Sequence, residues 1–219
     1  MRIILSTIII LFIETSIYGQ INYGIKSNLG ISMIVQNYDN SSNAKTYIAP
    51  SGQIGAFSSL KIKNKSYIGL ELLINQIEGR EEIFYETSWS WPYNESIGDS
   101  KVKFYTHITY ISIPTYYELK LNKLILNAGL QFSYCMLSSE KVKVTETVEW
   151  GTDTWEKTNK NLNIDKFNIG SRLGGAYVIT SKFSIEGVCY YGLNNINSSN
   201  STVKSKPLQI TVGIRYKIK

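Results

Sequence analysis

Apolar and polar residues alternate with a period of two along most of the chain. This period is typical of β-strands, and no segment carries a helical period of 3.6 residues over any length. In the last segment, Leu208, Ile210 and Val212 alternate with Gln209, Thr211 and Gly213. The pattern predicts eight strands, at about residues 21–34, 51–63, 66–77, 106–121, 124–137, 165–179, 182–193 and 208–218.

The connections between these predicted strands alternate in length. Short ones at 63–66, 121–123 and 180–182 separate long ones at 35–50, 78–105, 138–164 and 194–206. If consecutive strands are antiparallel, all long connections lie at one end and both chain ends at the other. The sequence therefore predicts an all-β fold, an eight-stranded antiparallel up-and-down transmembrane β-barrel with short periplasmic turns and long extracellular loops.

Glycines indicate which face of the predicted strands points inward. Alternation alone also fits an exported soluble barrel with an apolar interior. The apolar face contains only Gly52, Gly175 and Gly187, and the polar face contains Gly24, Gly30, Gly55, Gly69, Gly129, Gly170, Gly174, Gly192 and Gly213. A narrow eight-stranded lumen needs small residues among large ones. We therefore expect the polar face inside and the apolar face against lipid.

Aromatic residues on the apolar face gather near strand ends. Those at the short-turn end are Tyr23, Tyr117, Tyr177, Phe183 and Tyr216, and those at the other end are Phe132, Tyr134, Phe167 and Tyr191. Two aromatic girdles around an aliphatic band are typical of membrane barrels.

The N-terminus has the order of a secretory signal. A positive start at Arg2 is followed by an apolar run from Ile3 to Ile13 and a more polar stretch ending in Gly19. The run is shorter than the ~20 residues of a membrane-spanning helix. We expect a signal peptide at 1–19 and an outer-membrane barrel domain at 20–219.

Six charged residues fall on the polar face at strand depth: Lys26, Glu71, Glu118, Arg172, Glu186 and Arg215. Unpaired ions in a narrow lumen would each cost several kcal/mol. Three bases and three acids can pair, so we predict a charge network that fills the lumen. A proton or ion pathway is the alternative reading.

The stretch Tyr110-Ile111-Ser112-Ile113-Pro114-Thr115-Tyr116-Tyr117, with the glycine-rich strands, resembles the PorT-like small outer-membrane β-barrel family of Bacteroidetes-type Gram-negative bacteria. Ser112 stands where that family usually has Glu. The resemblance implies an eight-stranded barrel in the outer membrane and no catalytic residues.

The two central long connections carry all four tryptophans: Trp89, Trp91, Trp150 and Trp155. Alternation continues through both connections, which predicts hairpins that protrude past the membrane. Trp150 and Trp155 flank Gly-Thr-Asp-Thr, which suggests a turn that places the two rings opposite each other. An aromatic patch on these extracellular tips could bind a partner; the alternative is that the rings pack together or sit at the membrane surface.

Little in the sequence indicates catalysis. The chain has one His, two Cys and a net charge of +6 without a compact basic cluster, so nucleic-acid binding, a metal site and a cofactor are not expected. By parity His107 faces lipid, and eight-stranded lipid A deacylases use a membrane-facing His and Ser. The alternative is that His107 is a loop-end His in water with no catalytic role.

These observations favour a monomeric, non-enzymatic outer-membrane barrel in contact with membrane lipid, with a structural role or a cell-surface partner reached by the hairpins. The alternatives are an outer-membrane lipid-modifying enzyme that uses His107 and an exported soluble ligand-binding barrel.

Overall fold

The computed structural model describes residues 21–37, 44–91, 94–148, 151–160, 162–197 and 203–219, in which the regular elements are ten strands. They are β1 (Ile21–Asn37), β2 (Ala44–Tyr47), β3 (Ala49–Lys63), β4 (Ser66–Trp91), β5 (Asn94–Leu121), β6 (Leu124–Val148), β7 (Gly151–Lys160), β8 (Phe167–Val178), β9 (Phe183–Gly192) and β10 (Lys204–Lys217).

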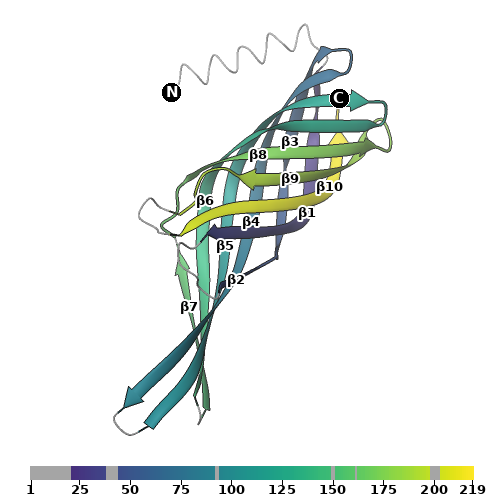
Figure 1. The fold of residues 1–219 in the computed structure, drawn as a ribbon. Coiled ribbons are helices and arrows are strands. Elements are labelled where there is room, and N and C mark those ends of the chain that lie inside the picture. Colours follow the sequence, from purple (N-terminus) through teal and green to yellow (C-terminus); the bar gives the residue numbers. More distant parts are fainter. Residues whose placement is uncertain (1–20, 38–43, 92–93, 149–150, 161, 198–202) are drawn as a thin grey trace.

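Eight of these strands close into a ring. The order is β4-β3-β1-β10-β9-β8-β6-β5, and β5 pairs with β4 again. Every pairing is antiparallel, and the first and last strands meet with Gly24 opposite Lys217. Closure leaves no free sheet edge, whose backbone N–H and C=O groups would find no hydrogen-bond partner in lipid. The predicted eight-stranded up-and-down barrel is confirmed (Figure 1).

The short connections are tight, as predicted. Lys63 pairs with Ser66 across one turn, and Leu121 pairs with Leu124 across another. Asn122 in the second turn has a φ of 54°. Asn tolerates this left-handed conformation better than most residues, which explains its place there.

The glycines show how tightly the lumen is filled. A Cβ added at any of the nine polar-face glycines would lie 2.0–2.6 Å from a neighbouring atom, whereas at Gly52, Gly175 and Gly187 the nearest atom is 3.4–4.0 Å away. At Gly69 the obstacle is the ring of Tyr116, at 2.1 Å. The polar face is therefore the crowded interior, as the glycine pattern predicted.

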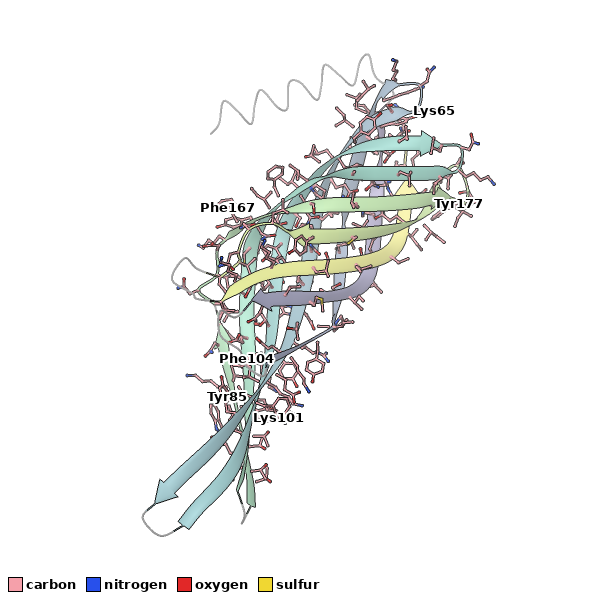
Figure 2. The ribbon with its side chains drawn as sticks, viewed as in Figure 1. Lys65, Tyr85, Lys101, Phe104, Phe167 and Tyr177 are labelled. Carbon is pink, nitrogen blue, oxygen red and sulfur yellow. The ribbon has the colours of Figure 1, made fainter. Side chains whose placement is uncertain are left out.

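The outward face is a broad apolar band with aromatic residues at both ends. Tyr134 and Phe167 contact each other at one end with ring centroids 5.1 Å apart, and Phe183 and Tyr216 do so at the other at 4.9 Å. Figure 2 shows Phe167 and Tyr177 at opposite ends of the barrel.

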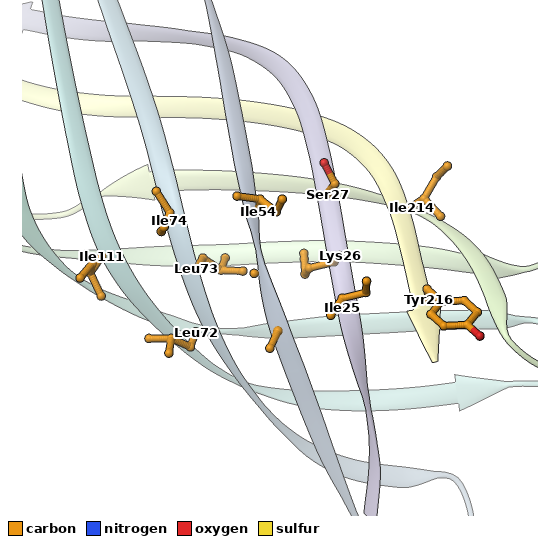
Figure 3. A pocket seen from close by; sticks show the side chains of 12 residues that line it. Ile25, Lys26, Ser27, Ile54, Leu72, Leu73, Ile74, Ile111, Ile214 and Tyr216 are labelled. Atoms are coloured by element: carbon orange, nitrogen blue, oxygen red, sulfur yellow. The ribbon is translucent and has the colours of Figure 1, made fainter. Parts of the chain in front are cut away.

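A shallow hollow of about 740 Å³ lies in this band, between side chains of β1, β3, β4, β5 and β10 (Figure 3). Most of the side chains around it are aliphatic, among them Ile54, Leu72 and Ile214, which are 54–58% exposed. In a membrane such a surface is covered by lipid acyl chains.

Strands β4, β5 and β6 continue well past the barrel, as predicted for the two central connections. With β2 on one side and β7 on the other they form a five-stranded antiparallel sheet in the order β2-β4-β5-β6-β7. We call this the protruding sheet: β2, residues 78–91 of β4, 94–107 of β5, 138–148 of β6, and β7. Figure 1 shows it extending from the end of the barrel opposite the short turns.

The protruding sheet reverses the polarity of the barrel. On β4 the outward side chains Leu72 and Ile74 are followed by Glu78, Arg80 and Glu82. The inner face becomes apolar instead, with Ile83 8% and Val144 7% exposed. The outward face contacts lipid within the apolar band and water beyond it, so its side chains change from apolar to polar where the strands pass the band.

On β6 this reversal depends on one bulge. Tyr110 pairs with Cys135 and Thr109 with Leu137, so Met136 has no partner on β5. The extra residue shifts the side-chain alternation by one. As a result, Val142 and Val144 lie on the inner face although they share the numbering parity of the lipid-facing residues earlier in β6.

The predicted signal peptide at 1–19 lies outside the described residues and stays a prediction. No helix in the described part of the chain is long and apolar enough to cross a membrane.

Candidate functional site: a filled lumen and a two-faced protruding sheet

Glu71 lies at the centre of a charged cluster in the lumen. Arg172 donates from Nη1 to Glu71 Oε2 at 2.8 Å and from Nη2 to Oε1 at 3.3 Å. The Tyr116 hydroxyl donates to Oε1 at 2.8 Å, and Lys26 Nζ lies 3.2 Å from Oε2. Two cations and a hydroxyl on one carboxylate offset much of the cost of taking the charges out of water.

The other charges complete the same cluster. Lys26 also pairs with Glu186. Arg215 Nη1 lies 3.3 Å from Glu118 Oε2, and its Nε lies 3.6 Å from Glu186 Oε2. All six predicted residues are at most 4% exposed. With three acids and three bases, the cluster has no net formal charge.

Between the charged cluster and the protruding sheet, the lumen is filled by side-chain amides and hydroxyls. Gln53 donates to Thr211 Oγ1 at 2.7 Å, and Gln209 donates to Asn75 Oδ1 at 2.9 Å. The hydroxyls of Ser112 and Ser133 lie 2.8 Å apart.

An apolar cap closes the end of the lumen next to the protruding sheet. Its buried members are Ile34, Ile77, Ile108, Tyr110, Cys135, Tyr190 and Ile196, with Ile164 packed against them. Ile164 and Ile196 come from connections that fold over the mouth, where Asp165 N donates to Ile196 O at 2.8 Å and Ile196 N to Ser205 O at 2.9 Å. The sequence reasoning missed this cap, although isoleucines on the polar face were its visible signal.

On the outward face, three strands bring Glu78, His107 and Ser139 into one cross-strand row. Glu78 Oε1 lies 3.2 Å from His107 Nδ1, and Ser139 is the neighbour of His107 on its other side. His107 thus lies within a strand, two residues beyond the last apolar row. Of the two threonines near it in sequence, Thr106 is on the inner face, where it donates to Glu140 Oε1 at 3.5 Å, and Thr109 lies in the neighbouring outward row, opposite Gln76.

Basic side chains dominate the next outward rows. Glu82 pairs with Lys101 and lies 3.9 Å from Lys103 Nζ. Glu156 lies 2.6 Å from Lys141 Nζ and 3.6 Å from Lys143 Nζ. Each carboxylate therefore faces two lysines, and each group keeps a surplus positive charge.

The inner face near the barrel mouth is acidic. Burial first, and then the nearby Glu140 carboxylate, raise the pKa of Glu81 to about 7. Burial also raises the pKa of Glu140. A hydrogen bond from Gln36 opposes the shift at Glu81. These two carboxylates therefore hold protons more tightly than exposed ones.

The structure corrects the predicted turn between β6 and β7. Val148 pairs with Gly151, so Gly151–Thr154 belongs to β7 and is not the turn. Trp155 faces Val144, not Trp150. The ladder that includes the Lys143–Glu156 pair fixes this register. Trp155 is 50% exposed, whereas Trp150 and the side chains of Trp89 and Trp91 lie outside the described residues.

The two cysteines lie apart from each other. Cys135 is buried in the cap and Cys189 is exposed on the outward face, and both are free thiols. Among the described residues, no three His, Cys, Asp or Glu side chains are grouped so as to hold a metal ion.

A closed antiparallel ring with an apolar outer band and a filled polar lumen defines a transmembrane β-barrel. Residues 14–198 match the family described as outer membrane protein beta-barrel domain, and the chain belongs to that family. The protein is accordingly placed in the cell outer membrane, with its long connections outside.

Among solved structures, the chain is similar to several outer-membrane proteins. Ail, the attachment invasion locus protein of Yersinia pestis, is 11% identical, with 89% of this chain and 99% of Ail covered at a TM-score of 0.38. Neisserial surface protein A is 12% identical, covering 89% and 97% at 0.36. The outer membrane protease OmpT of Escherichia coli is 9% identical, covering 92% and 97% at 0.36. Curated proteins give no match.

Proposed function

We propose that this protein is a non-enzymatic, monomeric surface protein whose protruding sheet contacts a partner outside the cell. The observation that carries the proposal is the contrast between its two parts. The lumen is filled by charge pairs, amides and an apolar cap, while three strands continue into a paired sheet beyond the membrane. A filled lumen does not serve as a channel, so the protruding sheet is the part available for function.

The lumen charge network has a structural role in this proposal. Eight strands leave room for side chains but little for a pore. Wild-type protein in planar bilayers should therefore give no large, steady conductance. Porin-like steps from the wild-type barrel would refute the plugged lumen.

The interaction role can be tested by shortening the hairpins in register. Tyr85 pairs with Ser100, and Thr145 pairs with Thr154, so removal of 86–99 and 146–153 leaves each hairpin closed by an existing pair. An Asn-Gly turn in place of each segment suits two-residue connections. Cells displaying the full protein should bind an array of matrix proteins and surface glycans more strongly than cells displaying the shortened one.

The contribution of the aromatic tips is tested by a second variant. Replacement of Trp89, Trp91, Trp150 and Trp155 by Ser removes the rings but keeps hairpin length. If both variants fold and adhere as the full protein does, the hairpins are not the functional part.

A second candidate is an acyl-ester hydrolase at the outward row. Glu78 holds His107 through Nδ1, and Ser139 is the cross-strand neighbour on the opposite side, which is the order acid, base and nucleophile that such chemistry needs. Ser139 Oγ would attack an ester carbonyl and His107 would take its proton, then return it to the leaving alcohol; water would release the acyl group. No hydrogen bond joins Ser139 and His107 in the described part of the chain, so this candidate stands second.

A fluorophosphonate probe tests this candidate without knowledge of a substrate. Labelling that is lost in Ser139→Ala and kept in Ser138→Ala would establish the nucleophile. Ser138 is a suitable control because it lies on the inner face, where its Oγ accepts a hydrogen bond from Leu162 N at 3.0 Å. No labelling of the wild type removes the candidate.

A further inference from the structure

A hollow of about 390 Å³ opens on the outward face of the protruding sheet, just beyond the apolar band. Its charged and aromatic lining comes from two cross-strand rows. One row contains Arg80, Tyr105 and Lys141, and the other contains Glu78 and His107. The hollow is separate from the filled lumen, because its residues point to the outside of the barrel.

Arg80 is the most available cation of this hollow. Its guanidinium lies over the ring of Tyr105, 5.8 Å from the centroid. In the described part of the chain no carboxylate forms an ion pair with it, whereas Glu78 is engaged by His107 and Glu156 by Lys141. A guanidinium presents several donors in one plane, which suits two oxygens of a phosphate group.

The charge around the hollow is positive in sum. In the four described rows nearest the barrel, the outward face carries seven basic side chains and three carboxylates. The basic ones are Lys45, Arg80, Lys101, Lys103, Lys141, Lys143 and Lys160, and the acidic ones are Glu78, Glu82 and Glu156. The resulting positive field favours an anionic ligand.

The hollow lies just beyond the layer of lipid headgroups, within reach of long side chains. Leu137, 64% exposed, is the last apolar side chain on the outward face of β6. Lys141 lies four residues further on, about 13 Å along a strand and roughly 10 Å in height at the usual barrel tilt. The polar layer on each side of a bilayer core is about 5–8 Å thick, and long basic side chains can reach back toward it.

From these observations we propose that the hollow binds the phosphate of a lipid in the outer leaflet that surrounds the barrel. Arg80 and Lys141 hold the phosphate oxygens, and the acyl chains of the same lipid lie along the apolar band below. A lipid is favoured over a soluble polyanion because the hollow and the lipid-facing band share one continuous face. The site goes beyond the proposed function and does not depend on what the hairpins bind.

The test uses the full barrel in a zwitterionic detergent. Short-chain phosphatidic acid is titrated and bound lipid is counted by native mass spectrometry, with short-chain phosphatidylcholine and a heparin-derived oligosaccharide as separate arms. We expect saturable binding of phosphatidic acid, little binding of phosphatidylcholine, and a loss of about tenfold or more in Arg80→Gln/Lys141→Gln, because two charge-assisted contacts disappear.

A charge-matched control separates the site from general electrostatics. Lys157→Gln/Lys123→Gln removes two charges, one on the inner face of β7 and one in a short turn at the far end of the barrel. It should bind phosphatidic acid like the wild type. Equal losses in both double variants, or binding of the oligosaccharide alone, would overturn the proposal. A gel shift on heating, which reports barrel closure, verifies that each variant is folded.

Discussion

Single residues in this protein act mainly through the space they leave or fill. The Tyr116 side chain packs over two positions on the neighbouring strands that have no side chain, Gly69 and Gly129, and this space lets its hydroxyl reach Glu71. A Cβ at Gly69 would lie 2.1 Å from that ring, and a Cβ at Gly129 would lie 2.6 Å from Tyr116 Cβ. Glycine, tyrosine and glutamate are thus parts of one arrangement.

Gly69→Ala should therefore destabilise the barrel. We expect a loss of about 1–3 kcal/mol from overpacking, measured by urea unfolding in lipid vesicles. Gly187→Ala is the matched control, since the nearest atom to its added Cβ is 4.0 Å away on the outward face. Similar losses in both variants would contradict the tight-lumen account.

Arg172→Ala should also lower the free energy of unfolding. The change leaves Glu71 buried with one cation fewer, and breaking a buried pair costs about 3–5 kcal/mol. The same vesicle assay measures the loss, with the surface variant Lys157→Ala as control. A loss below that of the surface variant would show that water solvates the cluster.

Glu81 should make the base of the protruding sheet sensitive to pH. Its pKa is raised from 4.5 to about 7 in the folded protein, first by burial and then by Glu140. The folded state therefore binds a proton that the unfolded state has released between these values. Stability contributed by this proton is complete below pH 4.5 and is lost as the pH rises to about 7 and above.

Hydrogen exchange at amides of 80–84 and 102–106, corrected for intrinsic rate, should report more frequent opening at pH 8 than at pH 5. Glu81→Gln should remove most of the difference, because an amide stays neutral and only the smaller contribution of Glu140 remains. The exposed Glu146→Gln is the control and should keep it. A pH effect that survives undiminished in Glu81→Gln would assign it to another group.

At the scale of elements, the bulge in β6 absorbs one extra residue, Met136, and so keeps the later side chains of β6 on their proper faces. Deletion of Met136 would convert the bulge into a regular ladder, with Cys135 still opposite Tyr110 and Leu137 still opposite Thr109. The faces beyond it would not change. Deletion of Val142 instead would turn Lys143 toward the inner apolar face, with no bulge nearby to correct it.

We therefore expect the Met136 deletion to fold with a protease-resistant protruding sheet, and the Val142 deletion to be cleaved rapidly between 138 and 160. Limited proteolysis in detergent compares them, and persistence of the barrel core serves as the internal control. Equal sensitivity of the two deletions would show that the bulge has another role.

At the scale of the whole molecule, membrane and water each impose a polarity on the same strands. Within the band, lipid requires an apolar outside, and the ring therefore encloses its polar groups. Beyond the band, β4–β6 carry basic residues on the outward face and turn Ile83, Phe104 and Val144 inward. Edge strand β7 is almost entirely exposed, and its charged residues disfavour pairing with another copy.

A closed barrel should resist unfolding by detergent at room temperature. Unheated protein should migrate at a different apparent mass from boiled protein on a detergent gel, and the shift should survive hairpin shortening because the ring itself is intact. A protein that is soluble without detergent and shows no shift would contradict the membrane barrel.

The sequence by itself determined the alternation, the number of strands in the ring, the side that faces lipid and the charges that enter the lumen. These follow from a local period of two and from residue size, which need no knowledge of distant partners. Only the tertiary structure decided which residues meet: Glu71 as the centre of the charges, the row Glu78–His107–Ser139, and the cap formed by Ile164 and Ile196. It also placed Gly151–Thr154 within β7 and not in a turn. The reason is physical, because register between strands is set by pairings across the whole ring, and one unpaired residue such as Met136 changes it without altering the local pattern.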